Sequence, residues 1–257
     1  MRKVAATRYV TALREGGSMP AIVEADDEGM YVLKFRGAGQ GPKALIAELV
    51  AGELARAAGL PVPEIAFIEL DADLARTEPD PEIQELIRRS AGLNIALDYL
   101  PGSVMFDPVV EKPDAALAAA IVWFDALVTN VDRTARNTNM LMWHRQLWLI
   151  DHGAALYFQH SWSNYLERSV DPFALIKDHV LLPFAGSIAA ADSELGARIT
   201  PQMIRDSVAL IPDDWLIADS PFESSEQHRD AYVQYLLRRL QSPHAFAEEA
   251  IRARSLV

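Results

Sequence analysis

The chain has 257 residues, half of them apolar and 23% charged, which is the composition of a packed globular protein with one large domain or two lobes. It contains no Cys, which excludes disulfides, thiol nucleophiles and Cys-ligated metals. Its net charge of −12 argues against nonspecific nucleic-acid binding, because that binding depends on a basic surface.

The first hundred residues show the pattern of several strands around one long helix. Alternating apolar segments predict strands at residues 8–13, 21–24, 30–35, 62–70 and 93–99, separated by turns rich in Gly, Pro and Asp. Apolar residues at helical spacing predict a helix over 42–58, which Gly59 ends, and a shorter helix over 81–89. We expect residues 1–100 to form a small β-rich lobe.

From residue 101 onward the pattern becomes mainly helical. Residues 115–129 are apolar on most sides, which predicts a buried central helix, and short strands at 140–143 and 147–150 follow. Further helices are predicted at 201–210, 226–240 and 244–254. The sequence therefore predicts an α+β fold with two lobes, in which residues 101–257 form the larger, mostly helical one.

Three polar residues surround the predicted pair of short strands. Asp132 lies in a polar loop after the buried helix, Asn137 follows five positions later, and Asp151 ends the apolar run 147–150. A carboxylate beside an attacking hydroxyl, followed by an amide and a carboxylate that can bind Mg²⁺, is the set that a phosphoryl-transfer site needs. Each residue alone is more typical of a turn cap, so the interpretation rests on the set.

One cation, Lys34, is a candidate for contact with nucleotide phosphate because of the acidic helix residue that follows it. Lys34 lies in the strand 30–35, and Glu48 lies in the helix that follows. A Lys–Glu pair between a strand and a helix is how kinases hold the Lys against the α- and β-phosphates of ATP. Glu53 is a competitor on a different face of the same helix, and we favour Glu48 because it follows the apolar residues 45–47. In isolation, Lys34 would be interpreted as a solvated edge residue.

Two glycine-rich segments are candidates for phosphate contact. Gly16, Gly17 and Ser18 lie between two predicted strands ahead of Lys34, where backbone N–H groups can face phosphate. Residues 37–41 follow Lys34 and lead into a helix, whose first N–H groups can also bind an anion. Neither segment contains a Walker motif. The first segment is our candidate for ATP, and the choice between the two stays open.

The end of the strand 93–99 is a candidate for adenine binding. Asp98, Tyr99 and Leu100 precede Pro101 and Gly102, at the junction of the two predicted lobes. Backbone groups there can bind the adenine edge while apolar side chains enclose the ring. A simple turn at the end of a strand explains the same pattern, and the sequence does not separate the two.

Together these residues resemble the HipA-like kinases, a branch of the protein-kinase-like fold that is similar to phosphatidylinositol 3/4-kinases. The resemblance covers residues 10–240 and rests on segments 130–133 with Asn137, 150–153, 33–34 leading to 47–48, and 54–63. It implies that Asp132 is the catalytic base, that Asn137 and Asp151 hold Mg²⁺, and that Lys34 contacts ATP phosphates. Thr134 stands where HipA-type toxins usually have a His, and the chain looks too short for their extra N-terminal subdomain. Toxin activity and an antitoxin partner are therefore not implied.

We expect an ATP- and Mg²⁺-dependent kinase that transfers the γ-phosphoryl group to a Ser or Thr hydroxyl of a protein. A small-molecule or lipid-headgroup acceptor is the first alternative, and a nucleotide-binding scaffold without catalysis is the second. Residues 1–8 lack the apolar run of a secretory signal, and the apolar stretch 115–124 is too short to span a bilayer. We therefore expect a cytoplasmic protein without a membrane partner.

Overall fold

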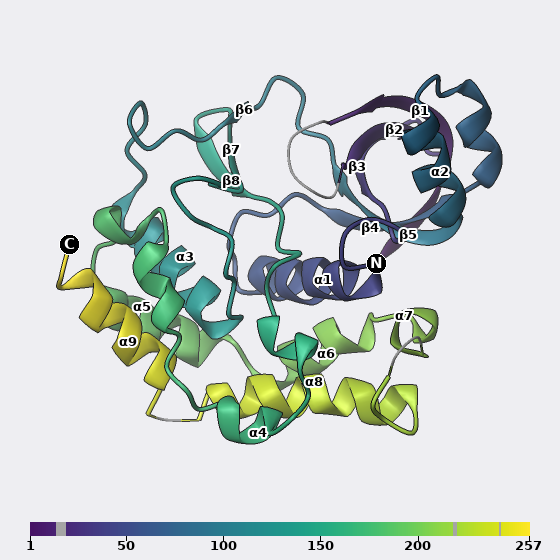
Figure 1. Ribbon diagram of the computed structural model, residues 1–257. Coiled ribbons are helices and arrows are strands. Elements are labelled where there is room, and N and C mark those ends of the chain that lie inside the picture. Colours follow the sequence, from purple (N-terminus) through teal and green to yellow (C-terminus); the bar gives the residue numbers. More distant parts are fainter. Residues whose placement is uncertain (14–18, 218–219, 242) are drawn as a thin grey trace.

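The strands form a closed barrel and a separate small sheet in the computed structural model, which describes residues 1–13, 19–217, 220–241 and 243–257 (Figure 1). The barrel order is β1-β2-β3-β5-β4, and the sheet order is β6-β7-β8. Neighbouring strands are antiparallel except β1 and β4, which are parallel. The strands are β1 Arg2–Ala12, β2 Ala21–Ala25, β3 Met30–Lys34, β4 Ile65–Leu70, β5 Gly92–Asp98, β6 Val104–Met105, β7 Met140–Trp143 and β8 Gln146–Leu149.

Helices make up most of the remaining chain. The α-helices are α1 Pro42–Ala57, α2 Pro81–Arg89, α3 Ala115–Leu127, α4 Tyr165–Arg168, α5 Ile188–Arg198, α6 Pro201–Ala209, α7 Asp213–Ile217, α8 Ser225–Arg239 and α9 Ala245–Arg254. Short 3₁₀ turns are η1 Ala72–Thr77, η2 Tyr157–His160, η3 Ala174–Asp178 and η4 Leu182–Phe184. Among the described residues, none of these helices has the length and apolar character needed to cross a bilayer.

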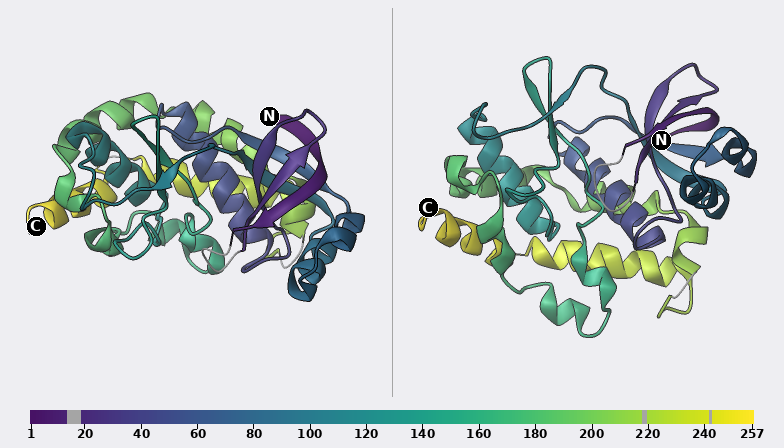
Figure 2. Two further views of the ribbon diagram at one scale, coloured as in Figure 1. Left: turned by 90° about the horizontal axis from the view of Figure 1, so that it is seen from above. Right: turned by 45° about the horizontal axis from the view of Figure 1, so that its top comes forward.

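The barrel has its own apolar core of small and β-branched side chains. Ala21, Val23 and Leu33 are fully buried inside it, and the helix α2 contributes Leu86 and Ile87 to the same core. Small residues suit this position because the interior of a five-stranded barrel is narrow. Figure 2 shows the barrel at one end of the molecule, with α2 on its outer side.

A second and larger core joins α1 to the helical part of the chain. Leu49 and Leu54 of α1 are fully buried in the same cluster as Trp123 and Phe124 of α3. On its barrel side α1 lies close to β4: a Cβ added at Gly52 would be 2.5 Å from the Cδ1 of Ile65. On its other side α1 contacts α6 and α7 (Figure 1). The helix that carries Glu48 is therefore held firmly between the barrel and the helices.

The predicted elements agree with the structure in most places, and the starts of two strands differ for physical reasons. Strand β1 begins at Arg2 rather than at residue 8, because its first half pairs with the distant strand β4. Strand β4 begins at Ile65, after the prolines at 61 and 63. Helix α5 and the short turns between 157 and 184 were not predicted. The boundary at residue 100 stays a prediction.

Arg239 joins the end of α3 to the loop after α4. Its guanidinium is buried and donates to the carbonyls of Ala126 and Leu127, at 2.8 Å each, and to those of Ser169 and Asp171, at 3.0 and 3.2 Å. The last carbonyls of a helix have no partner within the helix, so this cation satisfies the C-terminus of α3 and complements its dipole. Burial lowers the pKa of Arg239, but four carbonyls surround its charge.

Replacing Arg239 with Met should lower the free energy of unfolding by about 3 kcal/mol or more, because several buried carbonyls lose their donor. Chemical denaturation of the variant and the wild type measures this difference. The matched control is Arg238→Met, since Arg238 is the preceding residue of α8 and is exposed. Equal effects of the two substitutions would show that Arg239 does not anchor these segments.

Candidate active site

Lys34, Glu48 and Asp151 meet where the barrel, α1 and β8 come together. Lys34 is the last residue of β3, and its Nζ lies 2.5 Å from Asp151 Oδ1 and 3.3 Å from Glu48 Oε2. Glu48 is 1% exposed and Lys34 is 9% exposed, whereas the Asp151 side chain is 37% exposed. The structure therefore brings together the predicted Lys–Glu pair and the predicted metal-binding carboxylate, and Asp151 is the member that water can reach.

The electrostatics of the cluster keep Lys34 and Glu48 charged. Burial alone would lower the pKa of Lys34, but the carboxylates of Glu48 and Asp151 raise it well above its usual range. Burial would raise the pKa of Glu48, but the Lys34 ammonium and the neighbouring His152 hold it below its usual range. One buried cation is thus shared by two carboxylates, one from α1 and one from the end of β8.

Asp151 is held by an unusual backbone conformation and a buried neighbour. It follows β8 with a φ of 57°, in the left-handed region that residues other than Gly seldom adopt. His152 is fully buried, and its Nδ1 lies 3.8 Å from Glu48 Oε1. His152 therefore borders the buried carboxylate of Glu48, and within the described residues neither of its ring nitrogens has a hydrogen-bond partner.

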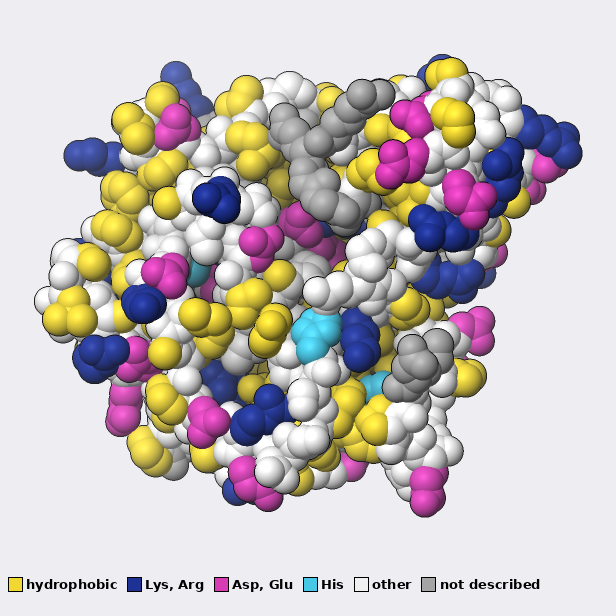
Figure 3. All heavy atoms as spheres, in the orientation of Figure 1, with side chains coloured by type: hydrophobic (Ala, Val, Ile, Leu, Met, Phe, Trp, Pro, Cys, Tyr) yellow, Lys and Arg dark blue, Asp and Glu magenta, His cyan; other side chains and the backbone are white. Residues whose placement is uncertain are grey.

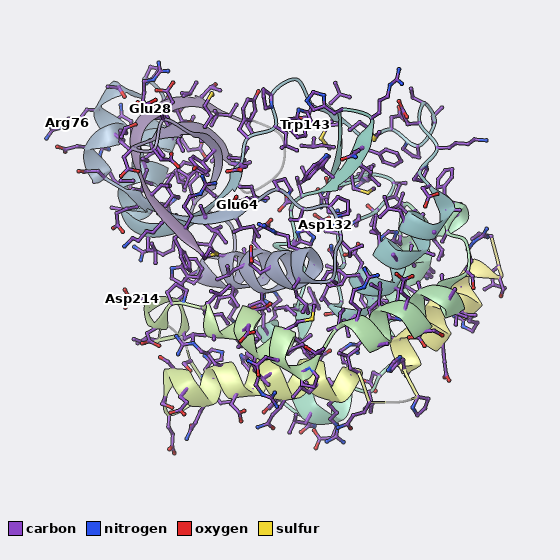
Figure 4. The ribbon with its side chains drawn as sticks, turned by 180° about the vertical axis from the view of Figure 1, so that it is seen from behind. Glu28, Glu64, Arg76, Asp132, Trp143 and Asp214 are labelled. Atoms are coloured by element: carbon purple, nitrogen blue, oxygen red, sulfur yellow. The ribbon has the colours of Figure 1, made fainter. Side chains whose placement is uncertain are left out.

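Asp132 and Asn137 are in direct contact within the loop between α3 and β7. Asp132 Oδ2 accepts hydrogen bonds from Asn137 Nδ2, at 2.7 Å, and from Asn139 Nδ2, at 3.2 Å. Within the described part of the chain, Asp132 Oδ1 and the amide oxygen of Asn137 accept no hydrogen bond. In Figure 4 Asp132 lies between the barrel and the helical lobe, far from Arg76 at the outer end of the barrel. One carboxylate oxygen and one amide oxygen therefore remain free for ligands.

A buried carboxylate under this loop holds it in place. Asp125 of α3 is fully buried and accepts from Asn130 Nδ2 at 3.1 Å, from Arg133 Nε at 2.5 Å and from His179 Nε2 at 2.9 Å. His179 Nδ1 accepts the backbone N–H of Leu181, so the proton that its Nε2 donates to Asp125 is fixed by this second bond. Asn130 and Arg133 flank Asp132, and both are held by the same anion.

The pKa values of this group follow from burial and pairing. Burial would raise the pKa of Asp125, but Arg133 and His179 hold it below its usual range. Burial lowers the pKa of His179, although Asp125 opposes that effect. Asp125, Asn139 and His179 were not among the site residues predicted from the sequence. The one available signal was a single Asp in the otherwise apolar segment 115–129, since a charge is seldom buried without a partner.

Arg133 connects the Asp132 loop to the Asp151 segment. Its Nη1 donates to the carbonyl of Asn139 and, at 3.3 Å, to that of Ile150, and the Ile150 N–H donates to Asn139 O at 3.1 Å. Ile150 immediately precedes Asp151, while Asn139 contacts Asp132 through its side chain. The two halves of the predicted site are therefore tied to each other through backbone groups that one buried guanidinium holds.

The predicted adenine segment has most of its backbone donors occupied. The N–H groups of Asp98 and Tyr99 donate to the carbonyls of Glu64 and Met30, at 2.9 and 3.0 Å. The Asp98 carboxylate accepts from Arg2 Nη2 at 2.7 Å, and partial burial raises its pKa against the opposing effect of Arg2. Leu100 is buried, which suits an apolar wall. If adenine binds here, the Leu100 N–H is the donor that the barrel leaves for it.

The two glycine-rich segments differ in what the structure shows. Gly16, Gly17 and Ser18 lie outside the described residues, so their assignment to phosphate stays a prediction. In the second segment, Gly39 and Gly41 have φ values of 50° and 65°, which favour Gly. Gly41 is the N-cap of α1 and provides no side-chain hydrogen bond to its first turn.

The available oxygen atoms of Asp151 and Asn137 suit a hard divalent cation that takes few ligands from the protein. Among the described residues, no three His, Asp or Glu side chains gather in a metal-binding group. Mg²⁺ commonly uses only one or two protein ligands and takes the rest from water and phosphate. The half-exposed Asp151 carboxylate and the free amide oxygen of Asn137 have the chemistry that such an ion requires. On the face drawn in Figure 3, acidic side chains gather in a recess near the middle of the molecule.

Comparisons with known proteins identify a family and a fold for this chain. The sequence model of the HipA-like kinase family matches residues 7–249. A search of curated proteins finds no match. The crystal structure of the Helicobacter pylori proinflammatory kinase CtkA is similar, with a TM-score of 0.60 and 15% identity over 97% of this chain and 96% of that one. The crystal structure of the Golgi casein kinase with Mn/ADP bound has a TM-score of 0.50 and 12% identity, over 96% of this chain and 75% of that one.

The structural likenesses show the fold, and the family match covers most of the chain. The barrel and the helices from α3 onward are the two main parts of this fold, and the division of the chain at residue 100 stays a prediction. The chain therefore belongs to the HipA-like kinase family and has a bilobal α+β fold of the protein-kinase type.

Proposed function

We propose that this protein is an ATP- and Mg²⁺-dependent kinase that transfers the γ-phosphoryl group to a Ser or Thr hydroxyl of a protein. The observation that carries the proposal is the Lys34 ammonium between Glu48 and Asp151, tied through Arg133 to the loop that presents Asp132. A cation for phosphate, a water-accessible carboxylate and a second carboxylate with one free oxygen are the groups that this reaction needs.

Asp132 acts on the acceptor hydroxyl. Its Oδ2 is held by two amide N–H groups, so its free Oδ1 can accept the hydroxyl proton and orient the oxygen. That oxygen forms a bond to the γ-phosphorus, the bond between this phosphorus and the β–γ bridging oxygen breaks, and ADP leaves with the electron pair. The proton passes to Asp132. Positioning and charge neutralisation supply most of the acceleration in such reactions.

Lys34 and the free oxygens of Asp151 and Asn137 act on the nucleotide. The buried carboxylate of Glu48 keeps the Lys34 ammonium in the site. The ammonium can then exchange its contact with the more exposed Asp151 for a contact with a phosphate. Asp151 and Asn137 are the residues that would hold Mg²⁺, and the ion would neutralise charge on the triphosphate. The Mn/ADP bound in the similar Golgi casein kinase supports use of a nucleotide and a divalent ion by this fold.

A protein acceptor agrees with the charge of the molecule and with its family. The net charge of −12 disfavours an anionic lipid surface, since proteins that act there usually carry a basic patch. Incubating the wild type with labelled ATP, Mg²⁺ and separate panels of proteins, small alcohols and lipids tests this choice. Transfer to small alcohols or lipids alone would contradict it, and absence of both nucleotide binding and transfer would contradict the whole proposal.

Asp132→Asn should lower kcat by about 100-fold or more while ATP affinity changes little, because general base catalysis contributes about 10²- to 10⁴-fold. Single-turnover transfer from labelled ATP gives the rate, and titration with a fluorescent ATP analogue gives the affinity. Asp214→Asn is the control, since Asp214 is exposed and lies at the far end of the helical lobe (Figure 4). A variant with the wild-type rate would remove Asp132 from the role of base.

Asp151→Asn should weaken nucleotide binding in the presence of Mg²⁺ by about tenfold or more, which corresponds to ~1.4 kcal/mol. Binding without Mg²⁺ should change less, because the metal-binding carboxylate then contributes little. Titrations with and without Mg²⁺ give the two affinities, and Asp214→Asn again serves as the control. If the variant keeps the Mg²⁺ dependence of the wild type, Asp151 is not a metal ligand.

Asp125→Asn should lower the free energy of unfolding by about 3 kcal/mol or more at pH 7, because Arg133 then lies buried without an anion. The pKa of Asp125 is lowered in the folded state, so its stabilisation is complete above the unfolded value of about 3.9 and is lost as pH falls toward the folded value. The difference between variant and wild type should therefore shrink below about pH 4.

Denaturation curves between pH 3 and 7, a range chosen to span the ordinary carboxyl pKa of about 4, measure this difference. Asp178→Asn is the matched control because Asp178 precedes His179 and is exposed. A difference that stays constant across this range would mean that the charge of Asp125 is not what stabilises the loop.

A further inference from the structure

A hollow of about 280 Å³ opens beside the Asp132 loop, on the helical lobe. Thr129 and Val131 line one part of it, Tyr157 and Phe158 another, and residues 171–175 a third. Its position differs from that of the charged cluster, because Lys34 and Asp151 do not line it. Figure 3 shows the lower half of this face hollowed, with apolar and basic side chains around the depression.

The hollow is attached to both halves of the candidate site. The segment after Asp151 runs beside the segment before Asp132, because the Leu156 N–H donates to Val128 O at 2.6 Å and the Tyr157 N–H donates to Thr129 Oγ1 at 3.1 Å. Val131 directly precedes Asp132 in the chain. A group that enters the hollow therefore contacts a segment whose next residue is the proposed catalytic base.

The two arginines that line the hollow, Arg239 and Arg168, already donate hydrogen bonds within the protein. Arg239 donates to the carbonyls of two α3 residues and two residues of the loop after α4, and Arg168 donates to the carbonyls of Ser161 and Ser163. The Asp171 side chain is exposed at the rim. A sugar or a lipid headgroup would need free polar partners, since unpaired polar groups are costly to bury. The surface that remains for a ligand is mainly apolar.

Two large side chains at the rim expose apolar surface to water. Leu175 is 50% exposed and Tyr157 is 53% exposed, and both line the hollow. A cavity of about 150 Å³ is enough to bind benzene, so this hollow has room for one large aliphatic or aromatic side chain. Its size and chemistry suit one residue of a polypeptide better than a polar metabolite.

We propose that this hollow is a docking subsite for the acceptor protein and holds one large apolar side chain close in sequence to the phosphorylated Ser or Thr. The proposal rests on the kinase function proposed above. It adds that the fit of this side chain in the hollow determines which acceptor is phosphorylated. An extended peptide advances about 3.3 Å per residue, so the anchoring residue stands at one fixed position within a few residues of the hydroxyl.

The test uses the full chain with labelled ATP, Mg²⁺ and a peptide library that has a central Ser or Thr and randomised flanking positions. The wild type should prefer Leu, Phe or Met at one position. Leu175→Asp should reduce that preference by about tenfold or more, because one apolar contact discriminates by about 10- to 200-fold. The same variant should gain a preference for Lys or Arg at that position, which misfolding does not produce.

Two further measurements separate this proposal from the kinase function itself. Leu175→Asp should keep the wild-type KM for ATP, and the control Ile251→Asp, at a 40% exposed residue of α9, should keep the wild-type peptide preference. An unchanged preference in Leu175→Asp, or a wild type that transfers phosphate without any apolar preference, would overturn the docking subsite and leave the kinase function standing. Transfer to small alcohols alone would overturn it as well.

Discussion

The ion pair between Asp125 and Arg133 is the interaction on which the site depends. Both side chains are fully shielded from water, so each charge is tolerable only while the other is present. The pair also organises its surroundings: Asp125 holds Asn130, while Arg133 reaches the carbonyls before Asp151 and beside Asp132. The loop that carries Asp132 and the strand end that carries Asp151 are thereby fixed relative to each other. A reaction that uses both carboxylates requires this fixed geometry.

The second constraint is that Lys34 is shared between the lobes. Its strand belongs to the barrel, whereas Asp151 follows β8 of the other lobe, and Glu48 comes from the helix between them. A ligand that draws Lys34 toward phosphate must change the Lys34–Asp151 contact, while the more deeply buried contact with Glu48 can persist. Binding of a nucleotide would therefore alter the electrostatics between the lobes at the point where they meet.

Patterns within short segments of the sequence predicted much of the secondary structure. Periodicity located most strands and helices, and the spacing of Asp132 and Asn137 within one loop correctly indicated that they lie together. Contacts between distant segments were not predictable in this way. The parallel pairing of β1 with β4 closes the barrel between residues 64 positions apart in the sequence, and His179 reaches Asp125 from a segment without periodicity. Each depends on the tertiary fold and leaves no local pattern.

The proposed reaction and the proposed choice of acceptor depend on different parts of the structure. The groups proposed to act on phosphate lie at the ends of regular elements or are held by buried ion pairs, and a substitution there is costly. The hollow is lined largely by the short turns between residues 157 and 175, which are attached to the core through backbone hydrogen bonds and Arg239. Side chains such as Leu175 project from these turns into water, so they can vary without disturbing the fold. Members of one kinase fold can therefore keep the reaction and differ in what they phosphorylate.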